Sequence, residues 1–264
     1  NFASSVPINV EASWESQKSD DILGSARAGY YFNAFPGAPD EDIWYPSALA
    51  NTLAGKDLDP RQSEILLTIN TTPDWYFATD GKPTFGKYDL ASVVLHEIAH
   101  GLGFMSNAQY DRFAGNAYIS QPTPFDAYVQ LPDGKTFTNF CSRSNELGRA
   151  MTNPLFWSGE SAIAANNGSK PKLYAPSPFE PGSSIAHLDE TSFDRRVADA
   201  VMTPNMDQGE VFQSPGPIAL AMIQDMLRKP PIGIATGLPS KPINLSALVG
   251  DKYALLTFDT PECS

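Results

Sequence analysis

The residues best suited to chemistry lie in the segment 96–104, which reads HEIAHGLGF. Its two histidines, His96 and His100, are four positions apart. On a helix, four residues turn through about 400°, so both imidazoles project from one face about 6 Å apart. That separation lets them bind one zinc ion, to which histidine nitrogens bond at about 2.0–2.1 Å. The segment therefore predicts two ligands of a zinc site on a helix.

Glu97 follows His96 and is rotated from it by about 100° on such a helix, which places its carboxylate beside the metal. A carboxylate there can bond to a zinc-held water, whose pKa zinc lowers towards about 7. It can take the proton as the water attacks a carbonyl carbon and later return it to the leaving amine. The short motif also occurs by chance, but here it lies among apolar residues, where these polar groups would be costly to bury without a shared purpose. Glu97 is therefore the predicted catalytic base of a hydrolase.

A complete site needs a third protein ligand, and the chain contains three histidines in all. The remaining one, His187, lies in the segment SIAHLDE, 87 residues after His100. Met202 follows it in AVMTPNM. Three carboxylates stay open as alternative third ligands: Glu146, Asp189 and Glu190.

The order H-E-x-x-H-x-x-G, a later histidine and then a methionine resembles the metzincin clan of zinc endopeptidases. The commonest pattern of that clan has its third histidine three residues after the glycine, where this chain has Ser106. A displaced third histidine is similar to the leishmanolysin-like group and to secreted bacterial metallopeptidases, in which an insertion precedes the last histidine. The resemblance covers residues 5–228.

The resemblance implies roles for two further residues. Gly103 would let the chain leave the helix sharply towards the third ligand, where a side chain would be strained at positive φ. Met202 would form an apolar floor beneath the metal. Some metzincins carry a zinc-binding tyrosine two residues after this methionine, but this chain has Pro204 there, so a fifth ligand of that kind is not expected. A tyrosine of the insertion, such as Tyr174, remains a candidate to assist.

The pattern of apolar residues predicts the elements that position these side chains. Strands are expected at 6–13 and at 64–70, which reads EILLTIN. Helices are expected at 46–54, with Gly55 just past the end, at 90–101 with Asp89 as N-cap, and at 215–229. Residues 122–181 contain eight prolines and few periodic segments, so we expect a loop-rich region there.

The expected fold class is α+β, metzincin-like, with two lobes in one catalytic domain. Residues 1–104 would form an upper lobe with a twisted mixed sheet and the active-site helix. Residues 105–229 would form an irregular lower lobe with the proline-rich insertion, the third ligand, the methionine turn and a closing helix. Residues 230–264 are expected to be a wrapping tail or a linker.

The resemblance also implies that an extended substrate pairs with an edge strand upstream of the active-site helix, by strand addition. EILLTIN is the candidate strand, with a buried central strand as the alternative. Residues 202–207 would help to build the pocket beyond the cleaved bond. Calcium is a possible second metal because of the acidic loops ATDG and LPDG, although neither has the twelve-residue calcium-loop spacing.

Composition limits the partners. Hydrophobic residues make up 42% and charged residues 18% of the chain, as in globular proteins. The formal charge of −12 argues against nucleic acid and anionic membranes, which attract basic patches. No apolar run approaches the ~20 residues of a membrane span, and we expect a monomer.

Export is the expected localisation. Cys141 and Cys263 are the only cysteines and lie far apart, which favours a long-range disulfide in a secreted protein over two unpaired thiols. No basic-then-apolar leader is present at Asn1, so we expect any export signal to have been removed.

Together these features predict a secreted zinc endopeptidase that acts on protein or peptide substrates. One alternative is a zinc-stabilised binding or adhesion module without turnover, although such a scaffold needs no base at Glu97. The other is a zinc hydrolase of non-peptide amides or esters.

Overall fold

The structure is a computed structural model that describes residues 3–17, 19, 21–141, 143–194 and 197–230, and the backbone of the strands at 243–249 and 254–259. Its largest sheet in the first half contains β1 (Val10–Glu15), β5 (Ile65–Asn70) and β2 (Gly24–Ala28), in the order β1-β5-β2. β1 runs parallel to β5, whereas β2 runs antiparallel to it, so the sheet is mixed as expected. The first strand begins four residues later than the apolar alternation predicted.

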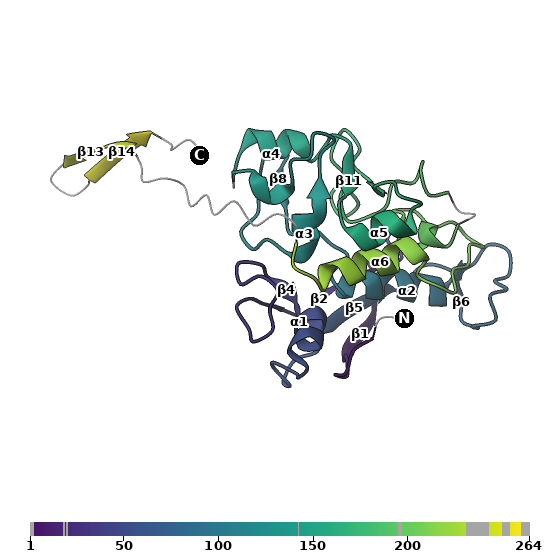
Figure 1. The fold of residues 1–264 in the computed structure, drawn as a ribbon. Coiled ribbons are helices and arrows are strands. Elements are labelled where there is room, and N and C mark those ends of the chain that lie inside the picture. The colour runs from purple at the N-terminus through teal and green to yellow at the C-terminus, as the bar shows by residue number, and fades with distance from the viewer. Residues whose placement is uncertain are drawn as a thin grey trace.

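The helix α2 (Leu90–Gly101) lies over β5 and β2 (Figure 1). It begins at the predicted N-cap Asp89, whose Oδ2 accepts hydrogen bonds from the backbone N–H and the hydroxyl of Ser92. Its apolar face buries Val93 and Ala99 in the main core. Near its end Gly101 packs so closely on β5 that an added Cβ would lie 2.3 Å from Ile65 Cγ2. Asp89 therefore fixes where the helix begins, and Gly101 lets its end lie against the sheet.

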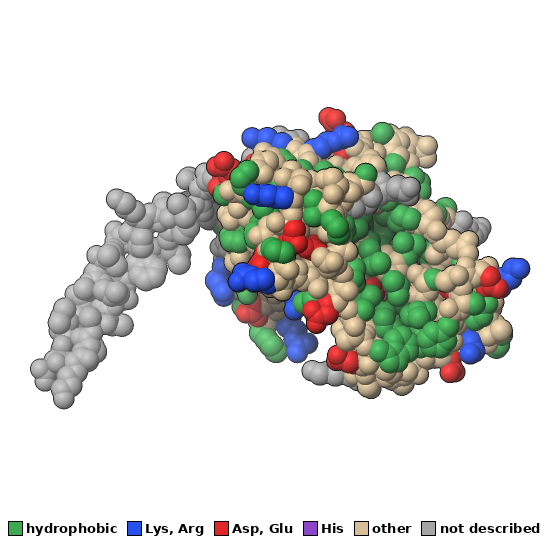
Figure 2. Space-filling model, turned by 90° about the horizontal axis from the view of Figure 1, so that it is seen from below, with side chains coloured by type: hydrophobic (Ala, Val, Ile, Leu, Met, Phe, Trp, Pro, Cys, Tyr) green, Lys and Arg blue, Asp and Glu red, His purple; other side chains and the backbone are tan. Residues whose placement is uncertain are grey.

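The edge of the sheet is less covered. Because α2 lies over β5 and β2, the outermost strand β1 keeps Val10 and Trp14 about half exposed. Trp14 packs with ring centroids 6.0 Å from both Trp75 and the exposed Phe77. Hydrophobic side chains accordingly gather over part of the face seen from below (Figure 2).

Shorter elements complete this half. α1 (Ser47–Ala54) begins after Pro46 and ends at Gly55, whose φ of 65° is left-handed, so the predicted helix is confirmed. β3 (Tyr31–Phe32) pairs antiparallel with β4 (Tyr45–Pro46), and β6 (Trp75–Tyr76) pairs parallel with β7 (Tyr88–Asp89).

The proline-rich region is more ordered than predicted. Its helices are α3 (Pro124–Tyr128), α4 (Asn145–Ala150) and α5 (Glu160–Ala165), with a 3-10 turn at Phe137–Asn139. Its strands β10 (Val129–Gln130), β11 (Leu155–Trp157) and β12 (Lys172–Leu173) form an antiparallel sheet. Just before this region, β8 (Gln109–Asp111) pairs with β9 (Asn116–Tyr118). Most of residues 122–181 is loop and turn, as predicted, but the short elements were not predicted, because they leave no periodic pattern and because Pro124 begins a helix, as a proline at the first turn can.

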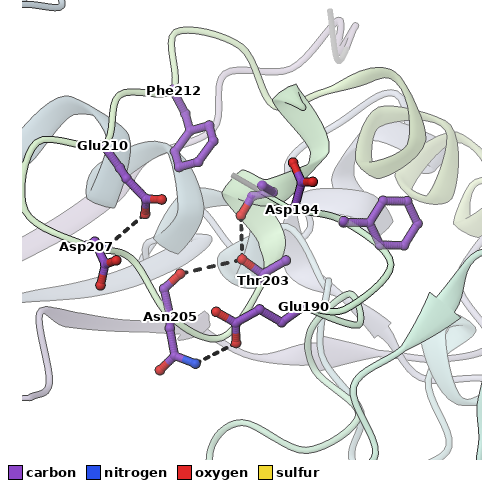
Figure 3. A pocket seen from close by; sticks show the side chains of 9 residues that line it. Glu190, Asp194, Thr203, Asn205, Asp207, Glu210 and Phe212 are labelled. Atoms are coloured by element: carbon purple, nitrogen blue, oxygen red, sulfur yellow. Dashed lines mark hydrogen bonds between the residues drawn. The ribbon is translucent and has the colours of Figure 1, made fainter. Parts of the chain in front are cut away.

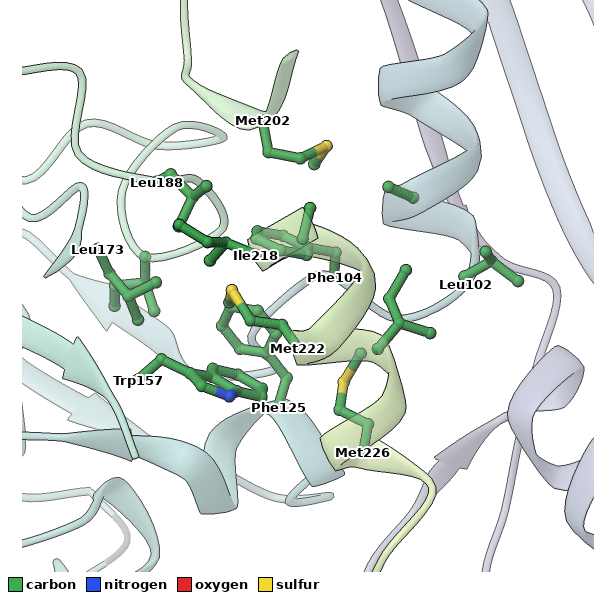
Figure 4. Close-up of a cluster of buried hydrophobic side chains, with 14 of the residues drawn as sticks. Leu102, Phe104, Phe125, Trp157, Leu173, Leu188, Met202, Ile218, Met222 and Met226 are labelled. Carbon is green, nitrogen blue, oxygen red and sulfur yellow. The ribbon is translucent and has the colours of Figure 1, made fainter. Parts of the chain in front are cut away.

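The helix α6 (Pro217–Met226) closes the described body of the protein and is confirmed where the apolar spacing predicted it. Ile218, Met222 and Met226 are buried on one face, in a core that also includes Trp157 of β11 and Leu102 from the end of α2 (Figure 4). One hydrophobic core therefore spans both predicted lobes, and the α+β class is confirmed.

The tail contains β13 (Ile243–Val249) and β14 (Ala254–Asp259), which pair as an antiparallel hairpin. The connection at 231–242 lies outside the described residues, so the role of the tail stays a prediction. Cys141 is disulfide-bonded, and Cys263 also lies outside the described residues. In the part of the chain that the structure describes, no helix is long and apolar enough to cross a membrane.

Asp225 of α6 holds three donors of the second half, so its removal is expected to destabilise the fold. Its carboxylate accepts from Trp157 Nε1–H and from the backbone N–H groups of Ser161 and Ala162, at 2.9–3.1 Å. Asp225→Ala leaves these buried donors unpaired, and we expect a loss of about 3 kcal/mol or more in unfolding free energy, measured by urea denaturation. The control Asp133→Ala removes an exposed carboxylate that accepts from Lys135 N–H and should cost less than about 1 kcal/mol. Equal losses would contradict this role.

Candidate metal centre

The three histidines of the chain converge on one point. α2 presents His96 and His100 on one face, and the loop after β12 brings His187 to them. The Nε2 atoms of His96 and His100 are 2.9 Å apart, and the Nε2 atom of His187 is 3.2 Å from each. The structure thus brings together the three residues predicted to bind zinc.

The opposite ring nitrogens are all held by backbone carbonyls. His96 Nδ1–H donates to Val201 O at 2.5 Å, and His100 Nδ1–H donates to Phe104 O at 2.7 Å. Because a carbonyl can only accept, the proton of each neutral imidazole lies on Nδ1 and the lone pair lies on Nε2.

His187 follows the same rule, since its Nδ1–H donates to Ser183 O at 2.8 Å. Three lone pairs therefore face one another at 2.9–3.2 Å, with no proton between them. In a tetrahedral complex with metal–nitrogen bonds of about 2.0–2.1 Å, ligand nitrogens lie about 3.3–3.4 Å apart. The donor set fits a cation of that size.

Burial keeps the three imidazoles neutral. Desolvation lowers the pKa of His96, and it lowers the pKa of His187 to about 3. The pKa of His100 lies well below its ordinary value, chiefly because of burial and then because of the two neighbouring histidines. Neutral imidazoles are the form that binds metals.

Glu97 lies between α2 and the edge strand β2 and is 5% exposed. Ala26 N–H donates to its carboxylate, while Oε2 is buried without a hydrogen-bond partner among the described residues. Burial raises the pKa of Glu97 to about 8 in the absence of a metal, and a bound cation would lower this pKa, because a nearby positive charge favours the carboxylate. Gly24 makes room for this side chain, since a Cβ there would lie 3.2 Å from Glu97 Cγ and Oε1. An unpaired carboxyl oxygen in the cleft that the three histidines also line fits a cation with a polar molecule attached.

The predicted methionine turn anchors two of the histidines. Met202 ends a 3-10 turn, Ala198–Met202, and is fully buried (Figure 4). The carbonyl before it, Val201 O, holds His96, and Met202 O accepts from the N–H of Leu188, next to His187. Asp199 ties the turn to α6 by accepting from Ile218 N–H and Ala219 N–H.

Gly103 and Ser106 have structural roles at the end of α2. Gly103 has φ 112°, and a Cβ there would lie 2.7 Å from Pro46 Cγ. The turn that it makes brings Phe104 O back to His100 Nδ1. Ser106 Oγ donates to the buried carboxylate of Asp126 at 2.6 Å, away from the three histidines.

The alternative ligands are not part of the histidine cluster, which is the only group of metal-binding candidates among the described residues. Glu146 is 67% exposed and pairs with Lys135 at 3.6 Å. Glu190 accepts from Asn205 Nδ2. Asp189 accepts hydrogen bonds from the hydroxyls of Thr191 and Ser192 and pairs with Lys172.

The other candidate residues also have partners. The Tyr174 hydroxyl donates to Glu180 at 2.8 Å, and burial with that bond raises the pKa of Tyr174 to about 12. In the loops proposed for calcium, Asp80 accepts from the Tyr76 hydroxyl, and Asp133 from a backbone N–H. Both carboxylates therefore close local turns, and neither belongs to a group of metal-binding side chains among the described residues.

A cleft of about 780 Å³ opens beside the histidines. Residues 21–26 form one wall, α2 forms the floor with His96 and Glu97, and segments 181–183 and 203–207 form the other wall. The edge strand along this cleft is β2, because β5 pairs on both sides. The prediction that EILLTIN is the edge strand was therefore wrong.

β2 was missed because its sequence, GSARA, is short and has no β-branched residue. Its outer edge nevertheless faces the cleft. Leu23 O and Gly29 N–H form hydrogen bonds towards β5. The N–H and C=O groups of the even-numbered residues between them therefore point away from β5, towards the outer edge. Ala26 N–H is one of these and bonds to Glu97.

A smaller pocket of about 180 Å³ adjoins the cleft, with which it shares Glu190, Thr203, Asn205 and Asp207 (Figure 3). Hydrogen bonds from Asn205 Nδ2 to Glu190 and from Asp207 N–H to Glu210 shape its rim. It lies where the resemblance implied a substrate pocket, in the segment that follows Met202.

Comparison with known proteins adds one partial match. A family model described as SPBPB7E8-like matches residues 43–132 of the 264. That range includes α2 with His96 and His100 but ends before His187 and Met202. No curated protein and no solved structure matches the chain.

Gly103→Ala is expected to destabilise the protein more than a glycine replacement at an open turn. Alanine at φ 112° is strained by about 1–3 kcal/mol, and its Cβ would also displace Pro46. The control Gly115→Ala has φ 66° and open space around the added Cβ, so it should lose only about 1–2 kcal/mol. Urea unfolding of both variants measures the difference, and a Gly103→Ala variant no less stable than the control would refute the close approach to Pro46.

Proposed function

We propose that this chain is a zinc-dependent endopeptidase of the metzincin type, similar to the leishmanolysin-like group. One observation carries the proposal: three neutral imidazoles direct their Nε2 lone pairs at one point, in a cleft that is also lined by Glu97, whose Oε2 has no hydrogen-bond partner among the described residues. Three nitrogen ligands with an open fourth position are typical of catalytic zinc sites, whereas structural zinc sites use four protein ligands.

His96, His100 and His187 would hold the zinc ion. When bound, it would supply a Lewis acid and a water acidic enough to react near neutral pH. Glu97 Oε2 is free to accept a proton during attack on the substrate carbonyl, while its bond from Ala26 N–H keeps the carboxylate in place. The same carboxyl group can then donate the proton to the leaving amine.

An extended peptide is the substrate form that suits this cleft. β2 offers an unpaired edge along it, so a substrate strand would add to β2 by backbone hydrogen bonds. Gly24 lies on that edge next to Glu97, which brings the substrate backbone close to the base. The pocket behind Thr203 and Asn205 would then receive a side chain beyond the cleaved bond.

Export and a monomeric state complete the proposal. A disulfide at Cys141 suits an oxidising compartment outside the cytosol. The wide, open cleft has room for a segment of an unfolded protein, which is the substrate used in the tests below.

Glu97→Ala tests the mechanism. The variant should retain one zinc per chain, because the three imidazoles are intact, and should cleave casein about 10²–10⁴-fold more slowly than the wild type. The control Glu146→Ala removes an exposed carboxylate away from the histidines and should keep wild-type activity. A chelator should abolish wild-type cleavage and added zinc should restore it. Wild-type activity of Glu97→Ala would exclude the mechanism, and a zinc-loaded wild type that cleaves no protein would favour a binding module.

His187→Ala tests the third ligand. Loss of a ligand should raise the zinc dissociation constant by more than about 100-fold, since even outer partners of ligands contribute about 10–100-fold. Competition with a chromophoric chelator measures this constant. The control Asp189→Asn alters a neighbouring carboxylate that bonds to Thr191 and Ser192, and should bind zinc as the wild type does. Unchanged zinc affinity in His187→Ala would exclude His187 as a ligand.

A further inference from the structure

Ile185, two residues before His187, has an unusual backbone conformation. Its φ is 74°, in the left-handed region that β-branched residues avoid. The other non-glycine residues with positive φ in the described chain, Ala34, Arg143 and Asn167, are not β-branched. Such outliers persist only where their surroundings enforce them, and they concentrate at functional sites.

Two backbone hydrogen bonds flank this conformation. Ile185 N–H donates to Tyr174 O at 2.7 Å, and Tyr174 N–H donates to His187 O at 2.9 Å. Beyond His187 the chain continues in register with β12, through the bridge between Leu173 and Leu188. Ile185 therefore lies between a turn and the segment that is bonded to β12.

The side chain of Ile185 gives a second anchor. It is 1% exposed and belongs to the main hydrophobic core. On the turn side, Ser184 N–H donates to Glu180 O, and Glu180 N–H donates to Ser184 Oγ. The left-handed residue thus connects a hydrogen-bonded turn at 180–184 to residues 187–189, which are bonded to β12 through an isolated bridge and the Asp189 N–H.

The conformation of Ile185 places the carbonyl of Ser183 against the ring of His187. This carbonyl accepts from His187 Nδ1–H at 2.8 Å, which fixes both the ring and its tautomer. An extended conformation at residue 185 would swing the turn away from the strand and would separate Ser183 O from the His187 ring. The fold therefore directs His187 Nε2 towards His96 and His100 through the backbone of Ile185.

We propose that Ile185 is a positioning residue, whose buried side chain enforces the left-handed turn that aims His187 at the metal. This inference rests on the proposed zinc site. It explains why the least suitable kind of side chain occupies a left-handed position, where glycine or asparagine would fit without strain. The strained turn holds His187 in its binding orientation before a metal binds, so less ordering is needed on binding.

Ile185→Gly is the principal test, with zinc alone as the probe. Glycine can still adopt φ 74° but also populates other conformations. The turn therefore remains allowed in this variant, but it loses the buried side chain that enforces it. The zinc dissociation constant of the full chain should rise about 10–100-fold, as for other outer partners of metal ligands. Cobalt substituted for zinc should show weaker or shifted visible bands, because the third imidazole is less well placed.

Three further variants separate positioning from packing. Ile223→Ala truncates another buried isoleucine of the same core, on α6, and should lower the melting temperature while leaving zinc affinity within about 3-fold of the wild type. Ile185→Val keeps the β-branch and should restore wild-type affinity and the cobalt spectrum. If Ile185→Gly does not fold, Ile185→Ala serves instead and should show a loss of affinity of at least about 5-fold, because it removes the same buried atoms beyond Cβ.

The outcomes distinguish this inference from the function on which it rests. Wild-type zinc affinity and cobalt bands in Ile185→Gly or Ile185→Ala would overturn the role of Ile185 and leave the zinc peptidase intact. So would an equal loss of affinity in Ile223→Ala, since general loosening of the core would then explain it. A wild-type chain that binds neither zinc nor cobalt would overturn both.

Discussion

Three imidazole lone pairs facing one another within about 3 Å repel, and the rest of the structure exists to hold them there. Each ring is fixed from behind by a carbonyl acceptor, and each acceptor belongs to a different segment: Val201 of the methionine turn, Phe104 after α2, and Ser183 of the distant loop. A cation turns the repulsion into three bonds. Without one, the arrangement depends on the stability of the surrounding core.

That core explains why a site with ligands 87 residues apart can be rigid. The residues that carry the carbonyls are attached to one continuous cluster, which includes Phe104, Val201 and Met202. Asp199 joins the methionine turn to α6, and Asp225 joins α6 to β11 and α5. The long insertion is thus a packed part of the fold, and the candidate metal site lies where it meets the first half.

The sequence predicted the side chains of the site better than their supports. The histidine spacing, the N-cap at Asp89 and the apolar face of α6 each have a local signature, and all three appear in the structure. The edge strand β2 has none, because two alanines suffice to pack against α2. The strands of the insertion are two or three residues long, too short for any alternation to be visible. Sequence reasoning therefore placed the substrate edge on β5, the strand with the stronger β-propensity.

The three backbone carbonyls that accept from the histidine rings also affect how this site can change over evolutionary time. A carbonyl belongs to every amino acid, so substitutions at Val201, Phe104 or Ser183 leave the acceptor in place as long as the local backbone is preserved. The support of the metal site is therefore encoded in chain geometry, at residues such as Gly103 whose φ cannot be shared by most side chains. Related chains could differ at nearly every position around the histidines and still orient them alike, which would make such relatives easier to find by shape than by sequence.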